Sequence, residues 1–401
     1  MIDVSAFEPA GSNDAMRARH YSNHVSNGGR GVRSFEHLTS TLVHMLKSYR
    51  WLLLTAGLIA ALTSAAQETK HGTILTEYLA STVLRENRIG LDPNRRVKIV
   101  LPPGYAESVT AERRYPVVYY LHNTFWSAEK LLEDGSRVAV LERAWAAGTV
   151  KEFILVAADF SGPTTGSMYE NSPVSGRWLD FIVDELVPWV DGKFRTLARR
   201  ESRAVIGDFF GGRGALKLAM TRAEVFAVAY AMHPVATGTG PIPWSEVAID
   251  WPRLLAAKSW DEVGSDGRTR LFVAISQAFL PNLERPPFYC DFFKARDATG
   301  APVLDVEKTR RTKHEFLLEE TVEESAATLR TMRGLALDWG AFDQVQDHVY
   351  ANRQFSRKLD DLGVAHEAEE YNGNPFNRVW TEHGRVATRV LPFFARTLVF
   401  E

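Results

Sequence analysis

The chain has 401 residues, of which 45% are hydrophobic and 24% are charged, so it can bury a large core. Its 47 Lys and Arg residues nearly balance its 49 Asp and Glu residues, and this balance argues against nucleic acid or an anionic membrane surface as partner. Cys290 is the only cysteine, which excludes an intramolecular disulfide and a zinc site built on several thiolates.

The N-terminal part of the sequence predicts export. A short basic segment, 45–50, precedes the apolar run Trp51–Leu62, and small residues before Gln67 suit cleavage by signal peptidase. The apolar run is shorter than the roughly 20 residues that a membrane span needs. Residues 45–66 are therefore interpreted as a signal peptide of a secreted or periplasmic protein, with an uncleaved anchor as the alternative. Residues 1–44 are interpreted as disordered or as a spurious extension.

Beyond Gly72 the sequence alternates between apolar strands and amphipathic helices. The runs 115–121 and 153–158 are nearly continuous in apolar residues, as expected for strands that are covered on both faces of a parallel sheet. Segment 177–189 places its apolar residues on one helical face. Further strands are expected at 73–79 and 96–101, as edge strands, and at 226–231, 271–275, 333–338 and 366–371.

This alternation predicts an α/β fold, with a mostly parallel sheet of about eight strands and helices on both faces. Residues 67–401 are interpreted as one domain. Residues 234–268 and 280–318 are rich in Pro, Trp and charge and show weak periodicity. We expect them to pass over the carboxyl edge of the sheet, where pockets form in open α/β folds.

The segment Val205–Leu216 is typical of a nucleophile elbow, the sharp strand-to-helix turn that presents a catalytic side chain above the sheet. Such a turn needs small residues on both sides, and the glycines of this segment supply them. The motif G-x-S-x-G requires a serine two residues after Gly207. Phe209 stands there instead, and it has no atom that can attack a carbonyl. An ordinary tight turn and a phosphate-binding turn are alternatives, although the glycine spacing matches neither nucleotide motif.

Several ordered motifs resemble the secreted esterases of the α/β-hydrolase fold, a family that includes feruloyl esterases, enterochelin esterases, S-formylglutathione hydrolases and mycolyltransferases. The resemblance covers about residues 72–400. Its most specific pieces, besides the elbow, are Leu101–Tyr105, Tyr115–His122, Asn171–Trp178 and Arg389–Phe394. The resemblance implies the α/β-hydrolase fold and a Ser-His-Asp site that acts on carboxylic esters or sugar esters.

The resemblance also assigns site residues, and most of the family's catalytic groups are replaced. Phe209 takes the nucleophile position and Pro375 the histidine position. Asp343 keeps the acid position, but the sequence offers no imidazole for it to orient, so a capping role in a loop is the competing interpretation. The oxyanion hole would be formed by the backbone N–H groups of Phe210 and Thr124.

Other residues are weaker candidates for the lost roles. Asp208 lies on the other side of the turn and would need a shifted register to act as nucleophile. His383 is interpreted as a surface histidine on the last helix, and His233, His348 and Ser276 as isolated residues. The sequence contains no pattern typical of a metal site, and neither a metal nor a cofactor is expected.

The sequence therefore predicts a degenerate esterase, either a catalytically inactive pseudoenzyme or a protein that binds a small-molecule ester or sugar ester in the old pocket. The ring of Phe209 is expected to fill the former catalytic gorge. An active esterase with an unrecognised nucleophile is the alternative. The sequence predicts no membrane contact beyond the signal segment, and it leaves the oligomeric state open.

Overall fold

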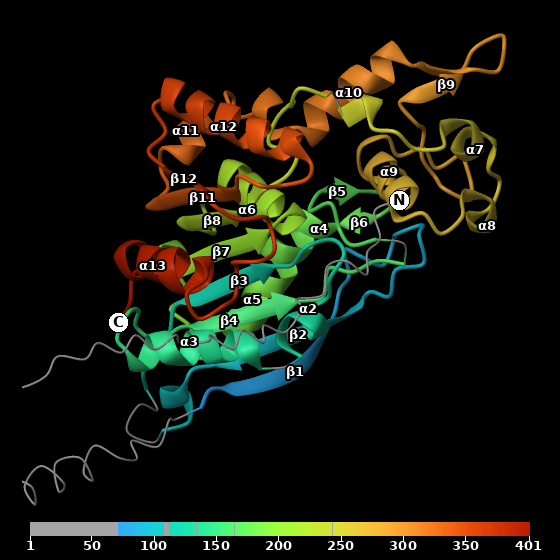
Figure 1. The fold of residues 1–401 in the computed structure, drawn as a ribbon. Helices are drawn as coiled ribbons and strands as arrows, with labels where there is room; N and C mark the ends of the chain where they lie inside the picture. The colour runs from blue at the N-terminus through green and yellow to red at the C-terminus, as the bar shows by residue number, and fades with distance from the viewer. Residues whose placement is uncertain (1–70, 108–111, 134, 164, 243) are drawn as a thin grey trace, which may run out of the picture. The chain divides into compact units, whose positions relative to one another are not determined.

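An eight-stranded sheet, in the order β1-β2-β4-β3-β7-β8-β11-β12, organises the chain (Figure 1). β1 and β2 run antiparallel to their neighbours, and each pair from β4 to β12 is parallel. The expected α/β fold with a mostly parallel sheet of about eight strands is confirmed. The strands are β1 (Thr73–Ala80), β2 (Asn94–Leu101), β3 (Val117–Leu121), β4 (Ile154–Ala158), β7 (Arg203–Asp208), β8 (Val228–Met232), β11 (Gly334–Gly340) and β12 (Glu367–Tyr371).

The computed structural model describes residues 71–401 except 108–111, 134, 164 and 243. The predicted signal peptide and the segment that precedes it lie outside the described residues. The helices are α2 (Ala128–Leu132), α3 (Ser136–Ala146), α4 (Trp178–Asp180), α5 (Val187–Lys193), α6 (Phe210–Thr221), α7 (Trp251–Ala256), α8 (Trp260–Val263), α9 (Gly267–Phe279), α10 (Val306–Phe316), α11 (Ala326–Leu329), α12 (Gln346–Asp361) and α13 (Leu391–Thr397), with π-helical turns at Phe181–Leu186 and Val386–Val390.

Each face of the sheet carries its own apolar core, because successive side chains of a strand point to opposite faces. In β3, Tyr119 packs into the core on the face covered by α6 and α12, whereas Val118 and Tyr120 pack into the core covered by α3 and α13. β3, β4 and β8 are buried at every position, which explains their unbroken apolar sequences. Helices therefore cover both faces, as expected.

Two strand assignments from the sequence were wrong. Residues 271–275 lie in the middle of α9, which begins after Asp266, whose side chain accepts a hydrogen bond from the Thr269 N–H. All five residues except Leu271 are buried, so a buried helix produced the same unbroken apolar run as a buried strand. β2 lies between β1 and β4, so only β1 is an edge strand on this side of the sheet.

The segment around α7, α8 and α9 has a small core of its own, beyond the ends of the strands (Figure 1). Trp251, Phe272 and Phe293 pack edge to face or tilted at its centre, with ring centroids 4.8–5.8 Å apart. The Ser172 hydroxyl donates to the Gln277 carbonyl (2.6 Å) and joins α9 to the hairpin of β5 (Asn171–Ser172) and β6 (Gly176–Arg177).

The first turn of α6 approaches the sheet so closely that only glycine fits at two positions. A Cβ atom on Gly207 would lie 2.2 Å from the Gly211 carbonyl carbon, and one on Gly211 would lie 1.9 Å from the Leu121 carbonyl oxygen. These contacts are with backbone, which cannot move without displacing a strand. Gly207 and Gly211 are therefore required by the close packing of α6 against β3 and β7.

Gly211→Ala is expected to lower the free energy of unfolding by about 2 kcal/mol or more, because the added methyl group overlaps the backbone of β3. Gly192→Ala is the matched control, since Gly192 lies exposed in α5 with no atom within 4 Å of an added Cβ. It is expected to be neutral or stabilising by up to ~1 kcal/mol. Urea unfolding measures both, and equal losses would contradict the steric argument.

Candidate active site

Phe209 occupies the elbow between β7 and α6 with φ 56° and ψ −114°. A non-glycine residue at positive φ costs about 1–3 kcal/mol, so the turn holds Phe209 in a strained conformation. The Phe209 N–H donates to the Met232 carbonyl (3.0 Å), and the Phe209 carbonyl accepts from the Arg213 N–H (3.1 Å). These bonds fix the turn within the sheet independently of the side chain that it carries.

The ring of Phe209 packs among four other rings. It lies parallel to the imidazole of His233 (centroid distance 6.2 Å, 11°) and perpendicular to that of His348 (5.3 Å, 90°). Its centroid lies 5.8 Å from the ring of Phe210 and 5.7 Å from that of Phe376. The ring is thus half buried among these side chains, and its burial offsets part of the backbone strain.

Asp343 lies beside this ring and is bound by two imidazoles. Its Oδ2 atom lies 2.8 Å from His233 Nε2 and 2.7 Å from His348 Nδ1. Its Oδ1 atom accepts from the Val345 N–H (2.8 Å). The interpretation of Asp343 as an acid without an imidazole was therefore wrong, and so was that of His233 and His348 as isolated residues. The fold brings them together from the end of β8, the loop after β11 and the first turn of α12.

Hydrogen bonds define the protonation of His233. The Gly340 N–H donates to His233 Nδ1 (2.9 Å), so the ring proton lies on Nε2 and is donated to Asp343. Burial lowers the pKa of His233 below its ordinary value, because a charged ring would be desolvated there, and the bond to Asp343 opposes that shift. The ring is 1% exposed and neutral, and it holds Asp343 in place.

Burial by itself raises the pKa of Asp343, because it disfavours the charged carboxylate. The hydrogen bonds from His233 and His348 outweigh this effect and hold the pKa of Asp343 well below its ordinary value. The carboxylate is therefore ionised at neutral pH.

Pro375 is buried in the loop after β12. The Phe342 N–H donates to the Gly373 carbonyl (2.9 Å), so this loop runs beside the loop that carries Asp343. The next residue, Phe376, contacts the ring of Phe209. The loop that carries Pro375, the residue to which the resemblance assigns the histidine position, therefore lies next to the cluster around Phe209.

The oxyanion candidates Thr124 and Phe210 lie in adjacent segments, because Leu121 of β3 pairs with Gly207 of β7. Thr124 is buried and its carbonyl accepts from the Gly166 N–H (2.7 Å). Phe210 is the first residue of α6. The segments that would form an oxyanion hole are thus neighbours.

Asp208 points to the other face of the sheet, where it accepts from the Tyr120 hydroxyl (2.8 Å). Burial raises its pKa. His383 is exposed, but it lies in a turn before the π-helical turn at Val386–Val390, so its expected place on the last helix was wrong. Neither residue belongs to the cluster around Phe209. Ser276 is buried within α9.

His233, Asp343 and His348 also have the composition of a metal site, with ligand atoms within 4.8 Å of one another. Their hydrogen bonds favour a different role. A metal on His233 Nε2 would require the proton on Nδ1, which instead faces the Gly340 N–H donor. Proton sharing within the cluster accounts for its short distances.

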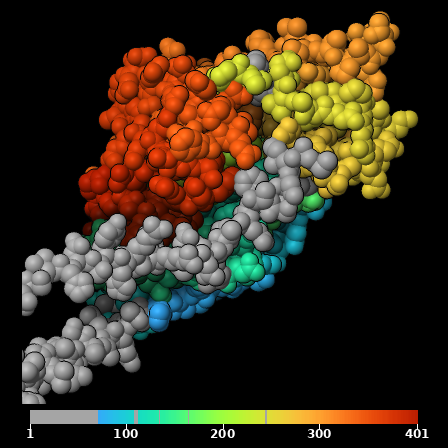
Figure 2. Space-filling model, viewed as in Figure 1, coloured from blue at the N-terminus to red at the C-terminus, as the bar shows by residue number. Residues whose placement is uncertain are grey.

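The loop after β8 contacts the first turn of α12 at Asp347, the residue before His348. The Ile242 N–H donates to Asp347 Oδ1 (2.9 Å) in the first turn of α12, and a Cβ atom on Gly240 would lie 2.5 Å or less from atoms of Asp347. Figure 2 shows the chain near residue 240, in yellow, against the orange and red C-terminal segments. The side chain of Ile242 is exposed, as is that of Phe342.

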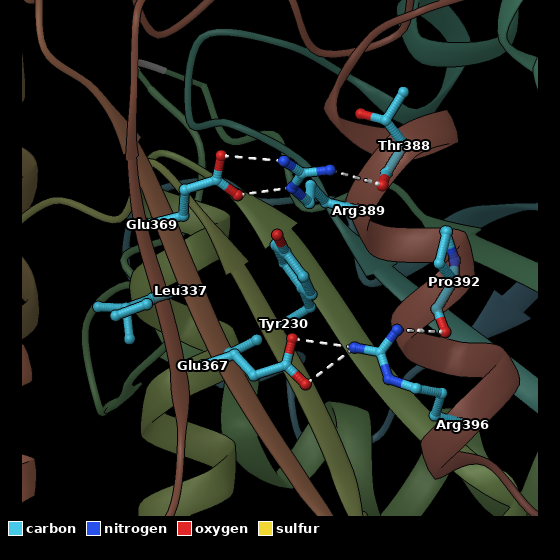
Figure 3. Close-up of a pocket in the computed structure, with 10 residues that line it drawn as sticks. Tyr230, Leu337, Glu367, Glu369, Thr388, Arg389, Pro392 and Arg396 are labelled. Atoms are coloured by element: carbon cyan, nitrogen blue, oxygen red, sulfur yellow. Dashed lines mark hydrogen bonds and ion pairs between the residues drawn. The ribbon is translucent and has the colours of Figure 1, made fainter.

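A separate cavity of about 230 Å³ lies between α13 and strands β8, β11 and β12 (Figure 3). Two ion pairs flank it, Arg389 with Glu369 (2.6 Å) and Arg396 with Glu367 (2.9 Å), and the ring of Tyr230 lies between them. Arg396 pairs with Glu367, whereas Glu369 binds both Arg389 and Arg385 (2.9 Å). None of the residues in the cluster around Phe209 lines this cavity.

The parallel sheet and the strained elbow define a protein of the α/β-hydrolase fold. A ferulic acid esterase superposes with a TM-score of 0.57 over 82% of this chain and 99% of its own, at 20% identity. An S-formylglutathione hydrolase from Agrobacterium tumefaciens reaches a TM-score of 0.50 over 82% and 97%, at 15% identity. At these identities the likeness concerns the fold alone.

Sequence comparisons point to esterases. Residues 90–285 match the family model described as "Putative esterase". Esterase Rv1288 of Mycobacterium tuberculosis H37Rv is 28% identical over 295 residues, which are 71% of this chain and 53% of that protein. The chain thus spans about half the length of this curated relative. An endo-1,4-beta-xylanase/feruloyl esterase of Xylanibacter ruminicola is 28% identical over 134 residues, 32% of this chain and 18% of that protein. These matches support membership of the esterase family and confirm the resemblance.

Within the described part of the chain, no helix combines the length and the hydrophobicity needed to cross a membrane.

The free energy of unfolding is expected to fall as the pH is lowered through about 6.5, the ordinary pKa of histidine. Because the pKa of His233 is lowered in the folded state, the unfolded chain binds a proton in this range that the folded chain does not, and acid therefore favours unfolding. His233→Gln is expected to reduce the difference in stability between about pH 5 and about pH 7.5. Urea unfolding at both pH values tests this, and an unchanged difference would exclude His233 as its source.

Proposed function

We propose that this chain is an esterase-family protein that has lost acyl-enzyme chemistry and is a pseudoenzyme with respect to serine ester hydrolysis. The observation that carries the proposal is Phe209, which stands at the elbow in the strained conformation of a nucleophile and packs its ring against His233, His348 and Phe376. A phenyl ring can neither attack a carbonyl nor give up a proton. Covalent catalysis at this position is therefore chemically impossible.

We further propose that the site binds a small carboxylic ester or sugar ester. The names of the relatives support this class of ligand, since they include esterases and a feruloyl esterase. The rings of Phe209, Phe210 and Phe376 are consistent with an apolar or aromatic acyl group.

The purified wild-type protein is expected to resist labelling by a fluorophosphonate and to hydrolyse a small aryl ester no faster than buffer alone, because no serine stands at the elbow. Labelling read by intact mass, with an active serine esterase as positive control, measures the first outcome. A covalent adduct on this chain would establish a different nucleophile and overturn the proposal.

We also propose that the protein is exported, because a basic segment, an apolar run and small residues before Gln67 follow one another in the sequence. The exported protein is expected to begin near Gln67. Mass spectrometry of the N-terminal peptide after expression with an intact leader tests this. An N-terminus at Met1 or Met45 would contradict it.

A further inference from the structure

His348 is held in a fixed orientation at the start of α12. Its Nδ1 atom lies 2.7 Å from Asp343 Oδ2, five residues earlier in the chain. The side-chain amide of Gln346 donates to the Asp343 carbonyl (2.5 Å), and the Val345 N–H donates to Asp343 Oδ1 (2.8 Å). The loop and the helix turn that carry the pair are therefore locked to each other.

These bonds determine which nitrogen of His348 is basic. Because the ionised Asp343 accepts at Nδ1, the proton lies there and the lone pair lies on Nε2. Nε2 has no hydrogen-bond partner among the described residues, and the side chain of His348 is 22% exposed. This is the tautomer that a general base needs, with a carboxylate that stabilises the imidazolium formed when the base takes a proton.

His348 also stands at the required place. Its ring centroid lies 5.3 Å from that of Phe209, the residue at the nucleophile position. A serine at position 209 would leave the volume of the phenyl ring to substrate. The serine hydroxyl would then lie near the imidazole of His348 and could transfer its proton to that ring directly or through one water molecule. His233 cannot fill this role, because both of its ring nitrogens are already bonded.

We propose that His348, oriented by Asp343, is the general base of this site and replaces the histidine that the resemblance assigns to Pro375. The nucleophile is then the one catalytic group that the site lacks. The inference rests on the proposed function, in which Phe209 is the reason for inactivity. With serine at position 209, the hydroxyl proton passes to His348 Nε2 as the bond from oxygen to the ester carbon forms. His348 then returns that proton to the departing alcohol, and water releases the acyl group by the same transfers.

The experiment compares variants for hydrolysis of p-nitrophenyl acetate and for fluorophosphonate labelling. Phe209→Ser is expected to be labelled and to exceed the wild type at least about tenfold. Adding His348→Gln is expected to reduce that rate about 100-fold or more, the usual contribution of a general base. The His348→Gln substitution should also remove the limb of the pH–rate profile that reports deprotonation of the base. Adding His383→Gln, at an exposed histidine, is the matched control and should change nothing.

Each contrary result has a distinct meaning. A folded Phe209→Ser variant that is inactive, or that is equally active with and without His348→Gln, would overturn the assignment of the base. Activity that appears only when Pro375→His is added would place the base in the loop after β12. Activity of the wild type would instead overturn the proposed function.

A measurement on the wild-type chain covers the case in which Phe209→Ser does not fold. Diethyl pyrocarbonate acylates the free nitrogen of a neutral imidazole, and peptide mass spectrometry locates the product. His348 is expected to react despite its partial burial, and Asp343→Asn is expected to slow it at least about threefold relative to the exposed His314 and His383. An unreactive His348 would show that Nε2 is not available, and the inference would fail.

Discussion

The close approach of α6 to the carboxyl ends of β3 and β7 is the constraint on which the site depends. It requires glycine at positions 207 and 211, because a Cβ atom at either would overlap backbone. It also forces residue 209 into a strained conformation, whatever its side chain. The elbow therefore belongs to the packing of the fold and can persist after the nucleophile has been lost. Phe209 shows this directly, since a bulky side chain keeps positive φ rather than relaxing the turn.

Most of the fold was predictable from the sequence, because its signals are local. Strands buried on both faces, such as β3 and β4, produce unbroken apolar runs, and the glycines of the elbow mark a close backbone approach. The same logic failed for α9, where burial on nearly all sides removed the helical periodicity. The structure places Asp343, after β11, beside Phe209, and Pro375, after β12, in the adjacent loop.

The histidines were missed for a physical reason. His233 is separated from Asp343 by 110 residues and meets it only because β8 and β11 are neighbours in the sheet. His348 is five residues from Asp343, and that spacing was the one local signal available. This spacing alone does not predict a contact. The two side chains meet because the turn between β11 and α12 directs them toward each other. The family motif places the catalytic histidine in the loop after β12, whereas the geometry of the structure favours His348 in α12.

The cluster around Asp343 is held together by its own buried groups, independently of the side chain at position 209. Asp343 and His233 are buried, and each satisfies a polar group of the other. Removing either leaves the partner unpaired in a low dielectric, which costs about 1–3 kcal/mol for a neutral group and more for a charge. The side chain of Phe209, by contrast, contributes ring packing alone. The proposed loss of a nucleophile at position 209 is thus a change that the Asp343 cluster can survive, because none of the hydrogen bonds that hold this cluster involves the side chain of residue 209.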